Sequence, residues 1–239
     1  EAGQRLFYLP VHLRLRRAQA GDRMLECRPT RRRSAAGAAG SDPDQGPGGD
    51  QAAEVLEDAG RLGMQWFKAP GHRIALLGPD DVSLGGSEYL WALHRQLAGV
   101  LAQLDLGLER RVQAAVRAAV SAGLVSAAHD CSEGGLAVAL AESAITGRDA
   151  IGCDVAIGGA GRPDHLLFGE GPSRVIVAVE PARQREFEAL MAESAIPWRW
   201  IGTTGGDRLR LSVEGRVVID AALDQVDHAW RSGFERHMA

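Results

Sequence analysis

An α+β fold, in which helices pack on a mixed sheet, is predicted by the order of strand and helix patterns along the chain. Helical patterns separate the strand patterns between residues 73 and 198. Near the end, two strand patterns follow one another directly, with only Glu214-Gly215 between them. A uniform parallel sheet would need a long crossover connection at that point. We therefore expect a mixed sheet rather than a doubly wound parallel one.

Four stretches carry a clear strand pattern. Arg73–Leu77 and Val175–Val179 are short apolar runs, typical of core strands, and the first stops at Gly78-Pro79. Apolar and polar residues alternate in Cys153–Ile157. Residues 209–219 contain two alternating strands joined by a tight turn, which predicts a hairpin.

Helical periodicity marks the segments between these strands. Residues 106–122 carry one apolar face, and Gly123 stands where a glycine commonly ends a helix. Pro181 occupies the favoured first position of a further helix. A glycine turn near residue 85 opens another helix, whose apolar stripe we expect to contain Leu90, Leu93, Leu97 and Leu101. The final helix carries Leu223, Val226, Trp230 and Phe234 on one face.

Residues 1–52 differ in composition from the rest of the 239-residue chain. They carry Arg31-Arg32-Arg33 and a Gly- and Pro-rich stretch, with almost no apolar periodicity. Such a segment buries too little apolar area to offset the entropy cost of ordering. We predict a disordered remnant over 1–52 and one folded domain over 53–239. A nucleic-acid-binding arm and a segment translated out of frame are two further interpretations of 1–52.

Composition narrows the class of protein. The chain is 45% hydrophobic and 24% charged, with a net charge of -4, as in ordinary globular proteins. That charge gives no general attraction to nucleic acid or membrane surfaces. No apolar run approaches the roughly 18 residues of a membrane-spanning helix. The three cysteines lack a CxxC spacing, which argues against a disulfide framework or a structural zinc site. We expect a cytoplasmic protein.

The region that concentrates possible chemistry is residues 125–145. Val125–Ala128 reads as a short buried strand, residues 129–133 as a polar turn, and Gly134-Gly135 as the start of a helix. Two glycines in a first helical turn suggest that something approaches the backbone closely. A helix start attracts anions, so one interpretation is a phosphate-facing turn. The other is tight helix–sheet packing.

Three polar glycine turns of this kind occur in the chain. Backbone N–H groups, serine hydroxyls and an arginine fork are the donors that phosphate recognition needs. None of the turns matches the sequence of a known phosphate loop or dinucleotide fingerprint. The candidate phosphate- or ligand-binding residues are Gly85, Gly86, Ser87, Ser132, Gly134, Gly135, Gly169, Glu170, Ser173 and Arg174.

Two alternatives compete at the same turns. His129 next to Cys131 suggests a cysteine nucleophile, although a small buried cysteine is the simpler interpretation. Acidic side chains here could bind Mg²⁺ through phosphate oxygens. We favour helix capping by Asp130 and Glu133 and a salt bridge between Glu170 and Arg174. No residue is assigned as catalytic, and metal ligands remain unknown; the carboxylates in question are Asp130, Glu133, Glu142 and Glu170.

The motifs resemble a known superfamily. Residues 129–136, followed by 141–143, resemble the C-terminal module of aminoimidazole ribonucleotide synthetase-like proteins. Residues 85–90 and 167–174 are similar to the second half of the phosphoribosylformylglycinamidine synthase family. The resemblance covers roughly residues 53–236. It implies a mixed sheet and helices in three layers.

The resemblance also implies a reaction. ATP, with magnesium, activates the amide oxygen of formylglycinamide ribonucleotide, and ammonia from a glutaminase subunit or domain then displaces phosphate. Family motifs expected after Val11 and in the missing N-terminal half are absent, so we expect a C-terminal fragment that is inactive alone. Neither nucleic acid nor membrane is an expected partner. Alternatives are another ATP-using member of the superfamily and a non-catalytic assembly or binding module.

Overall fold

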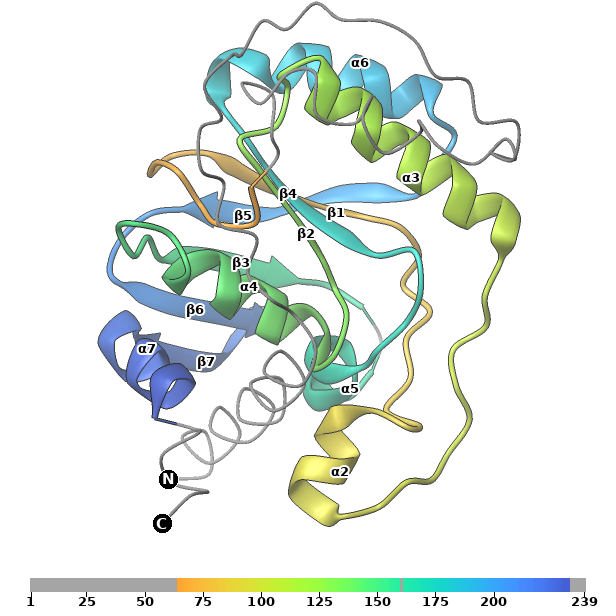
Figure 1. Cartoon of the computed structure of the whole chain (residues 1–239), viewed down its shortest axis with the longest axis vertical. Helices are drawn as coiled ribbons and strands as arrows, with labels where there is room; N and C mark the ends of the chain where they lie inside the picture. The colour runs from red at the N-terminus through yellow and green to blue at the C-terminus, as the bar shows by residue number, and fades with distance from the viewer. Residues whose placement is uncertain (1–63, 160, 233–239) are drawn as a thin grey trace, which may run out of the picture.

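A seven-stranded sheet forms the centre of the computed structural model, which describes residues 64–159 and 161–232 (Figure 1). Predictions for residues 1–63 therefore lie outside the described residues. Within these ranges, no helix is long and apolar enough to cross a membrane. The strands are β1 (Arg73–Leu77), β2 (Ala127–Asp130), β3 (Cys153–Ile157), β4 (Val175–Val179), β5 (Trp198–Thr204), β6 (Arg208–Val213) and β7 (Arg216–Ala222).

The sheet is mixed, as predicted. Its strand order is β2-β4-β1-β5-β3-β6-β7, in which β3 and β6 pair in parallel and every other pair of neighbours is antiparallel. The predicted hairpin is formed by β6 and β7. Its turn residues Glu214 and Gly215 have φ of 48° and 75°, the left-handed backbone that suits a two-residue hairpin loop.

Helices cover both faces of the sheet, which confirms three layers (Figure 1). Successive side chains of a strand point to opposite faces, so each central strand serves two cores. Ile74 and Leu76 of β1 pack in the core beneath α4, α5 and α7, whereas Ala75 and Leu77 pack beneath α3 and α6. The helices are α2 (Glu88–His94), α3 (Leu106–Ser121), α4 (Gly135–Ile145), α5 (Pro163–Phe168), the 3-10 helix η3 (Pro181–Arg183), α6 (Gln184–Glu193) and α7 (Leu223–Arg231).

The expected leucine stripe of α2 is wrong beyond His94. Arg95 has a φ of 54° and ends the helix, and Leu97 and Leu101 are 76% and 70% exposed in the loop that follows. This loop turns back onto the first glycine turn. A Cβ on Gly85 would lie 2.4 Å from the carbonyl oxygen of Val100, so glycine is needed there for close backbone packing.

Helix α4 is buried along its whole length, and it packs on the sheet and against helices α5 and α7 (Figure 1). Its residues are accordingly apolar or small on every side, apart from Glu142 and Ser143. Helix α3, in contrast, buries only the predicted face, represented by Val112, Ala115 and Ala119. Gly123 follows α3 with a φ of 65°, as expected of a glycine at a helix end.

Candidate functional site

A pocket of about 650 Å³ opens where the three glycine turns meet. Apolar and polar side chains of α3 form one wall of the pocket. The other walls come from the turns before α2, before α4 and before β4. The lining residues are Gly85, Leu101, Ala102, Glu109, Val112, Gln113, Val116, Arg117, Asp130, Cys131, Ser132, Glu133, Glu170, Gly171, Pro172, Ser173, Arg174 and Val175.

Half of the candidate ligand-binding residues face this pocket. Gly85, Ser132, Glu170, Ser173 and Arg174 belong to its lining. The other candidates are adjacent in the chain but are not part of the lining; they are Gly86, Ser87, Gly134, Gly135 and Gly169. The fold thus brings all three turns to one place, and the ligand role of their residues stays a prediction.

Glu170 ties two of the turns together. Its Oε1 atom accepts hydrogen bonds from the backbone N–H groups of Glu88 and Gly134, at 2.9 and 2.8 Å. These groups lie at the starts of α2 and α4, where a negative charge is favoured. Burial raises the pKa of Glu170, and the two N–H donors oppose that rise. The chain's own carboxylate therefore occupies part of the position proposed for an external anion.

This arrangement corrects the two local interpretations favoured from the sequence. Gly134 is the N-cap residue of α4 and no side chain caps it, so capping by Asp130 or Glu133 is wrong. The expected salt bridge between Glu170 and Arg174 is also wrong, because Glu170 accepts from backbone N–H groups instead. Ser87 does cap a helix: its hydroxyl oxygen accepts from Leu90 N–H at the start of α2.

Most of the glycine N–H groups in the turns are already used. Gly85 N–H donates to Ser83 Oγ at 2.9 Å, and Gly135 N–H donates to the Ser132 carbonyl at 3.0 Å. Gly86 and Gly169 likewise donate to carbonyl oxygens, those of Ala98 and His165, at 3.0 and 2.9 Å. Together with Gly134, these donors have partners inside the protein.

Gly135 is also required by packing. Its φ is 65°, and a Cβ there would lie 2.6 Å from the carbonyl oxygen of Gly169. Cβ atoms essentially never approach another atom so closely. The start of α4 therefore presses directly against the turn that carries Glu170, and close packing explains this glycine without a ligand.

Within residues 64–159 and 161–232, Arg174 is a buried polar residue of the pocket with two unpartnered nitrogen atoms. It is 5% exposed, and its Nε and Nη1 atoms have no hydrogen-bond partner among the described residues. Burial lowers the pKa of its guanidinium, and the negative charge of Asp80 offsets part of that effect. Asp80 is engaged elsewhere, in an ion pair with Arg199 at 2.6 Å. Arg174 thus carries a buried charge without a directly bonded counter-ion.

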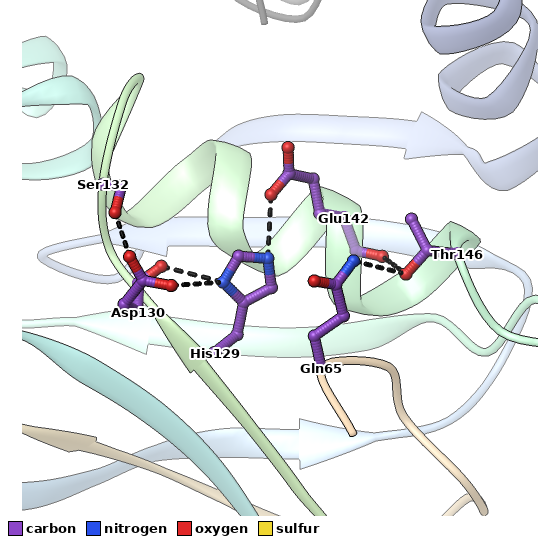
Figure 2. Close-up of polar contacts among 6 residues, drawn as sticks. All are labelled: Gln65, His129, Asp130, Ser132, Glu142 and Thr146. Carbon is purple, nitrogen blue, oxygen red and sulfur yellow. Dashed lines mark hydrogen bonds and ion pairs between the residues drawn. The ribbon is translucent and has the colours of Figure 1, made fainter. Parts of the chain in front are cut away.

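A second buried charge, on His129 of β2, forms an ion pair with a buried carboxylate (Figure 2). Its Nε2 lies 2.8 Å from Glu142 Oε2 of α4, and both side chains are almost completely buried. Its Nδ1 lies 2.8 Å from the Asp130 carbonyl oxygen and 3.6 Å from Asp130 Oδ1. Burial alone lowers the pKa of His129, but hydrogen bonds to Asp130 and Glu142 outweigh it and raise the pKa to about 9.

The raised pKa keeps His129 protonated near neutral pH. Its Nδ1 donates to the Asp130 carbonyl oxygen, and its Nε2 forms the ion pair with Glu142. Contact with His129 lowers the pKa of Asp130, whose carboxylate also accepts a hydrogen bond from Ser132 (Figure 2). His129 is therefore a link between β2 and α4 rather than a free general base.

Neither a cysteine nucleophile nor a protein-built metal centre is supported at the pocket. Cys131 is 4% exposed, and burial raises the pKa of its thiol to about 11, so the thiolate is scarce near neutral pH. Residues 64–159 and 161–232 contain no group of three or more His, Cys, Asp or Glu that could hold a metal ion. The donor set of this part of the chain does not form a magnesium site by itself, and no step is assigned to magnesium here.

Family membership follows from the domain as a whole. Residues 69–214 match the family described as "AIR synthase related protein, C-terminal domain", which is more than half of the chain. The chain belongs to this family. The turns at Gly134-Gly135 and at Glu170 both lie within the matched residues of the AIR synthase related domain.

Two curated relatives of this AIR synthase related chain carry the same name. The protein named phosphoribosylformylglycinamidine synthase subunit PurL from Moorella thermoacetica is 41% identical over 173 residues, which cover 72% of this chain and 23% of the relative. Its counterpart from Synechococcus elongatus is 42% identical over 196 residues, covering 77% and 25%. The chain thus spans about a quarter of the curated relatives it matches.

Solved structures share the fold at lower sequence identity. Thermotoga maritima PurL complexed with FGAR has a TM-score of 0.59 and 17% identity, over 70% of this chain and 30% of that one. The same protein complexed with ATP has a TM-score of 0.56 and 18% identity, over 70% and 27%. Both likenesses confirm the AIR synthase-like fold.

Sequence reasoning found the turns but missed the residues that connect them. It did not foresee Glu170 bridging two helix starts, the wall supplied by α3, or the ion pair between His129 and Glu142. One signal was available: Glu142 is the only charged residue in an otherwise small or apolar helix. A carboxylate in such a helix is seldom buried unless it is paired.

Proposed function

We propose that this chain is the C-terminal part of an ATP-dependent phosphoribosylformylglycinamidine synthase, and that its pocket forms one wall of a site for a phosphate-bearing ligand. The meeting of all three glycine turns at one pocket carries the proposal. The relatives' shared name and the titles of the T. maritima complexes supply the reaction and ligand classes.

The proposed reaction transfers phosphate from ATP to the amide oxygen of formylglycinamide ribonucleotide, with release of ADP. Ammonia then displaces that phosphate, and the carbon–oxygen bond is replaced by a carbon–nitrogen bond. The residues of this chain hold the ligand rather than carry out these steps. Glu170 fixes the relative position of the turns before α2 and α4, while Ser132, Ser173 and Arg174 face the pocket.

The partners follow from the same proposal. A preceding half of the synthase would complete the site, a glutaminase subunit or domain would supply ammonia, and magnesium would accompany ATP. We propose a cytoplasmic enzyme without a nucleic-acid or membrane partner. The net charge of -4 is consistent with this set, since it gives no broad electrostatic attraction to polyanions.

The test is a chimera. In Moorella thermoacetica PurL, the segment that aligns with this chain is replaced by the corresponding residues of this chain, and amidine formation is measured with ATP and ammonium chloride. We expect ATP-dependent turnover by the chimera and none by the 239-residue chain alone. Turnover by the isolated chain, or a folded chimera without turnover, would contradict the proposal.

Two glycine variants of the chimera form a matched pair. Gly123 and Gly135 both have a φ of 65°, but a Cβ at Gly123 meets nothing within 4 Å, whereas one at Gly135 overlaps Gly169. We expect Gly135→Ala to reduce turnover strongly and Gly123→Ala to preserve it. Equal effects would show that the contact between α4 and the Glu170 turn does not shape the site.

A further inference from the structure

The charges that line the pocket are not equally satisfied. Glu170 accepts two backbone N–H groups, Glu109 accepts hydrogen bonds from Gln113 and Ser173, and Asp130 is paired with His129. Arg174, in contrast, is only 5% exposed, and its Nε and Nη1 atoms have no hydrogen-bond partner among the described residues. The imbalance favours an anionic ligand over a cationic one, because the acids are engaged and the buried cation is not.

We propose that the Arg174 guanidinium, with Arg117, binds the phosphate group of the ligand, and that the glycine N–H groups do not. This inference rests on the proposed function, which supplies a phosphate ester as the ligand class. Both residues line the pocket, and they come from different elements: the turn before β4 and helix α3. Donors that converge from separate elements suit a tetrahedral dianion.

The alternative of a backbone phosphate loop conflicts with the hydrogen bonds. The N–H groups of Gly85, Gly86, Gly134, Gly135 and Gly169 all have partners inside the protein. A phosphate could use them only by displacing those partners, among them the Glu170 carboxylate at the start of α4. The glycines instead allow close backbone contacts, such as that between Gly135 and the carbonyl oxygen of Gly169.

Orthophosphate and ribose 5-phosphate serve as probes for the 239-residue chain in isothermal titration calorimetry, with acetate as the monovalent comparison. We expect phosphate binding to weaken at least about tenfold in Arg174→Met, since a charge-assisted hydrogen bond to a buried anion is lost. Arg117→Met, on the exposed side of α3, should weaken it by a smaller factor. Arg185→Met, an exposed arginine of α6 outside the pocket, is the matched control and should bind as the wild type does.

Circular dichroism and urea unfolding establish that each variant is folded, and Arg174→Lys provides a second test at the buried position because it keeps the charge but loses the guanidinium fork. Weaker binding in folded Arg174→Lys and in Arg117→Met supports the proposal. Unchanged binding in both, or no phosphate binding by the wild type, overturns it. A failed chimera with intact Arg174-dependent phosphate binding would reject the synthase function and keep this site.

Discussion

His129, on β2, and Arg174, directly before the neighbouring strand β4, are both buried cations, but only His129 has a carboxylate partner in the described part of the chain. In the ladder between β2 and β4, His129 lies opposite Ile176, and the N–H of Cys131 donates to the carbonyl of Arg174 at 2.8 Å. The imidazolium of His129 pairs with a buried carboxylate of α4 (Figure 2). The guanidinium of Arg174 has no bonded carboxylate and lines the pocket.

The difference separates a structural charge from a binding charge. A buried charge that is paired links two elements and contributes to the specificity of their packing. A buried charge that is left unpaired costs stability, and a fold that contains one retains it for a reason other than stability. The same pocket-side end of the sheet therefore contains a fixed link between β2 and α4 and, next to it, a group whose counter-ion comes from a ligand.

The largest effect should come from breaking the paired charge. Glu142→Leu leaves His129 buried without its partner, so we predict a loss of about 3–5 kcal/mol in the free energy of unfolding. His129→Leu should cost a similar amount. The double variant should cost clearly less than the sum of the two, as measured by urea unfolding in a double-mutant cycle. Additive losses would show that the two side chains do not depend on each other.

Alkaline pH weakens the same ion pair between His129 and Glu142, because it deprotonates His129. The pKa of His129 in the folded chain is about 9, above its ordinary value of 6.5. A group whose pKa is raised by folding contributes its full stability below the unfolded pKa and loses it as pH rises through the folded value. We predict that stability falls between pH 6.5 and 9.5, by at most about 3 kcal/mol. His129→Gln should flatten this part of the pH profile; an unchanged slope in that variant would assign it to other groups.

Removing the unpaired charge should have the opposite sign. Arg174→Met replaces a buried guanidinium without a partner by an apolar side chain of similar length. Without phosphate present, we predict a gain of roughly 1–3 kcal/mol in the free energy of unfolding, because the desolvation cost of unsatisfied donors disappears. Urea unfolding of the two proteins measures it. A loss of stability would mean that Arg174 has a structural role like that of His129.

The smallest effect concerns the carboxylate that joins the two helix starts. Glu170→Gln keeps an acceptor for the N–H groups of Glu88 and Gly134 but removes the charge from the start of α4. Burial raises the pKa of Glu170 despite these donors, so its charge is a net cost to the folded state, and we predict a gain of at most about 1 kcal/mol in urea unfolding. Glu193→Gln, at the exposed end of α6, is the control and should change little. A clear loss in Glu170→Gln would show that the helix starts depend on the negative charge.

Local pattern was sufficient to predict most of the fold. The apolar runs at β1 and β4, the alternation in β3 and the hairpin of β6 and β7 lie where periodicity placed them. The error at α2 arose from a contact that is distant in sequence. The chain after His94 packs on Gly85 through Gly99 and Val100, and this backbone contact overrides the leucine spacing.

The sequence predicted which residues lie at the site but not which hydrogen bonds and ion pairs they form. Glycine turns and the Ser173-Arg174 pair stand out in the sequence, and their meeting at one pocket depends on the strand order. The sequence did not predict which donors already have partners, because Glu170 and His129 find partners on other elements. Glu88, for example, is 82 residues from Glu170. The expected Glu170 to Arg174 pairing failed for this reason.

The most direct test of the distinction between side-chain and backbone recognition is a nuclear magnetic resonance titration. The Arg174 Nε–H resonance and the amide resonances of the five glycines are followed as ribose 5-phosphate is added to the ¹⁵N-labelled chain. We predict a large, saturable shift of the Arg174 resonance, with the glycine amides changing little. Large shifts of the Gly134 and Gly135 amides, with Arg174 Nε–H unmoved, would contradict binding by the unpaired guanidinium.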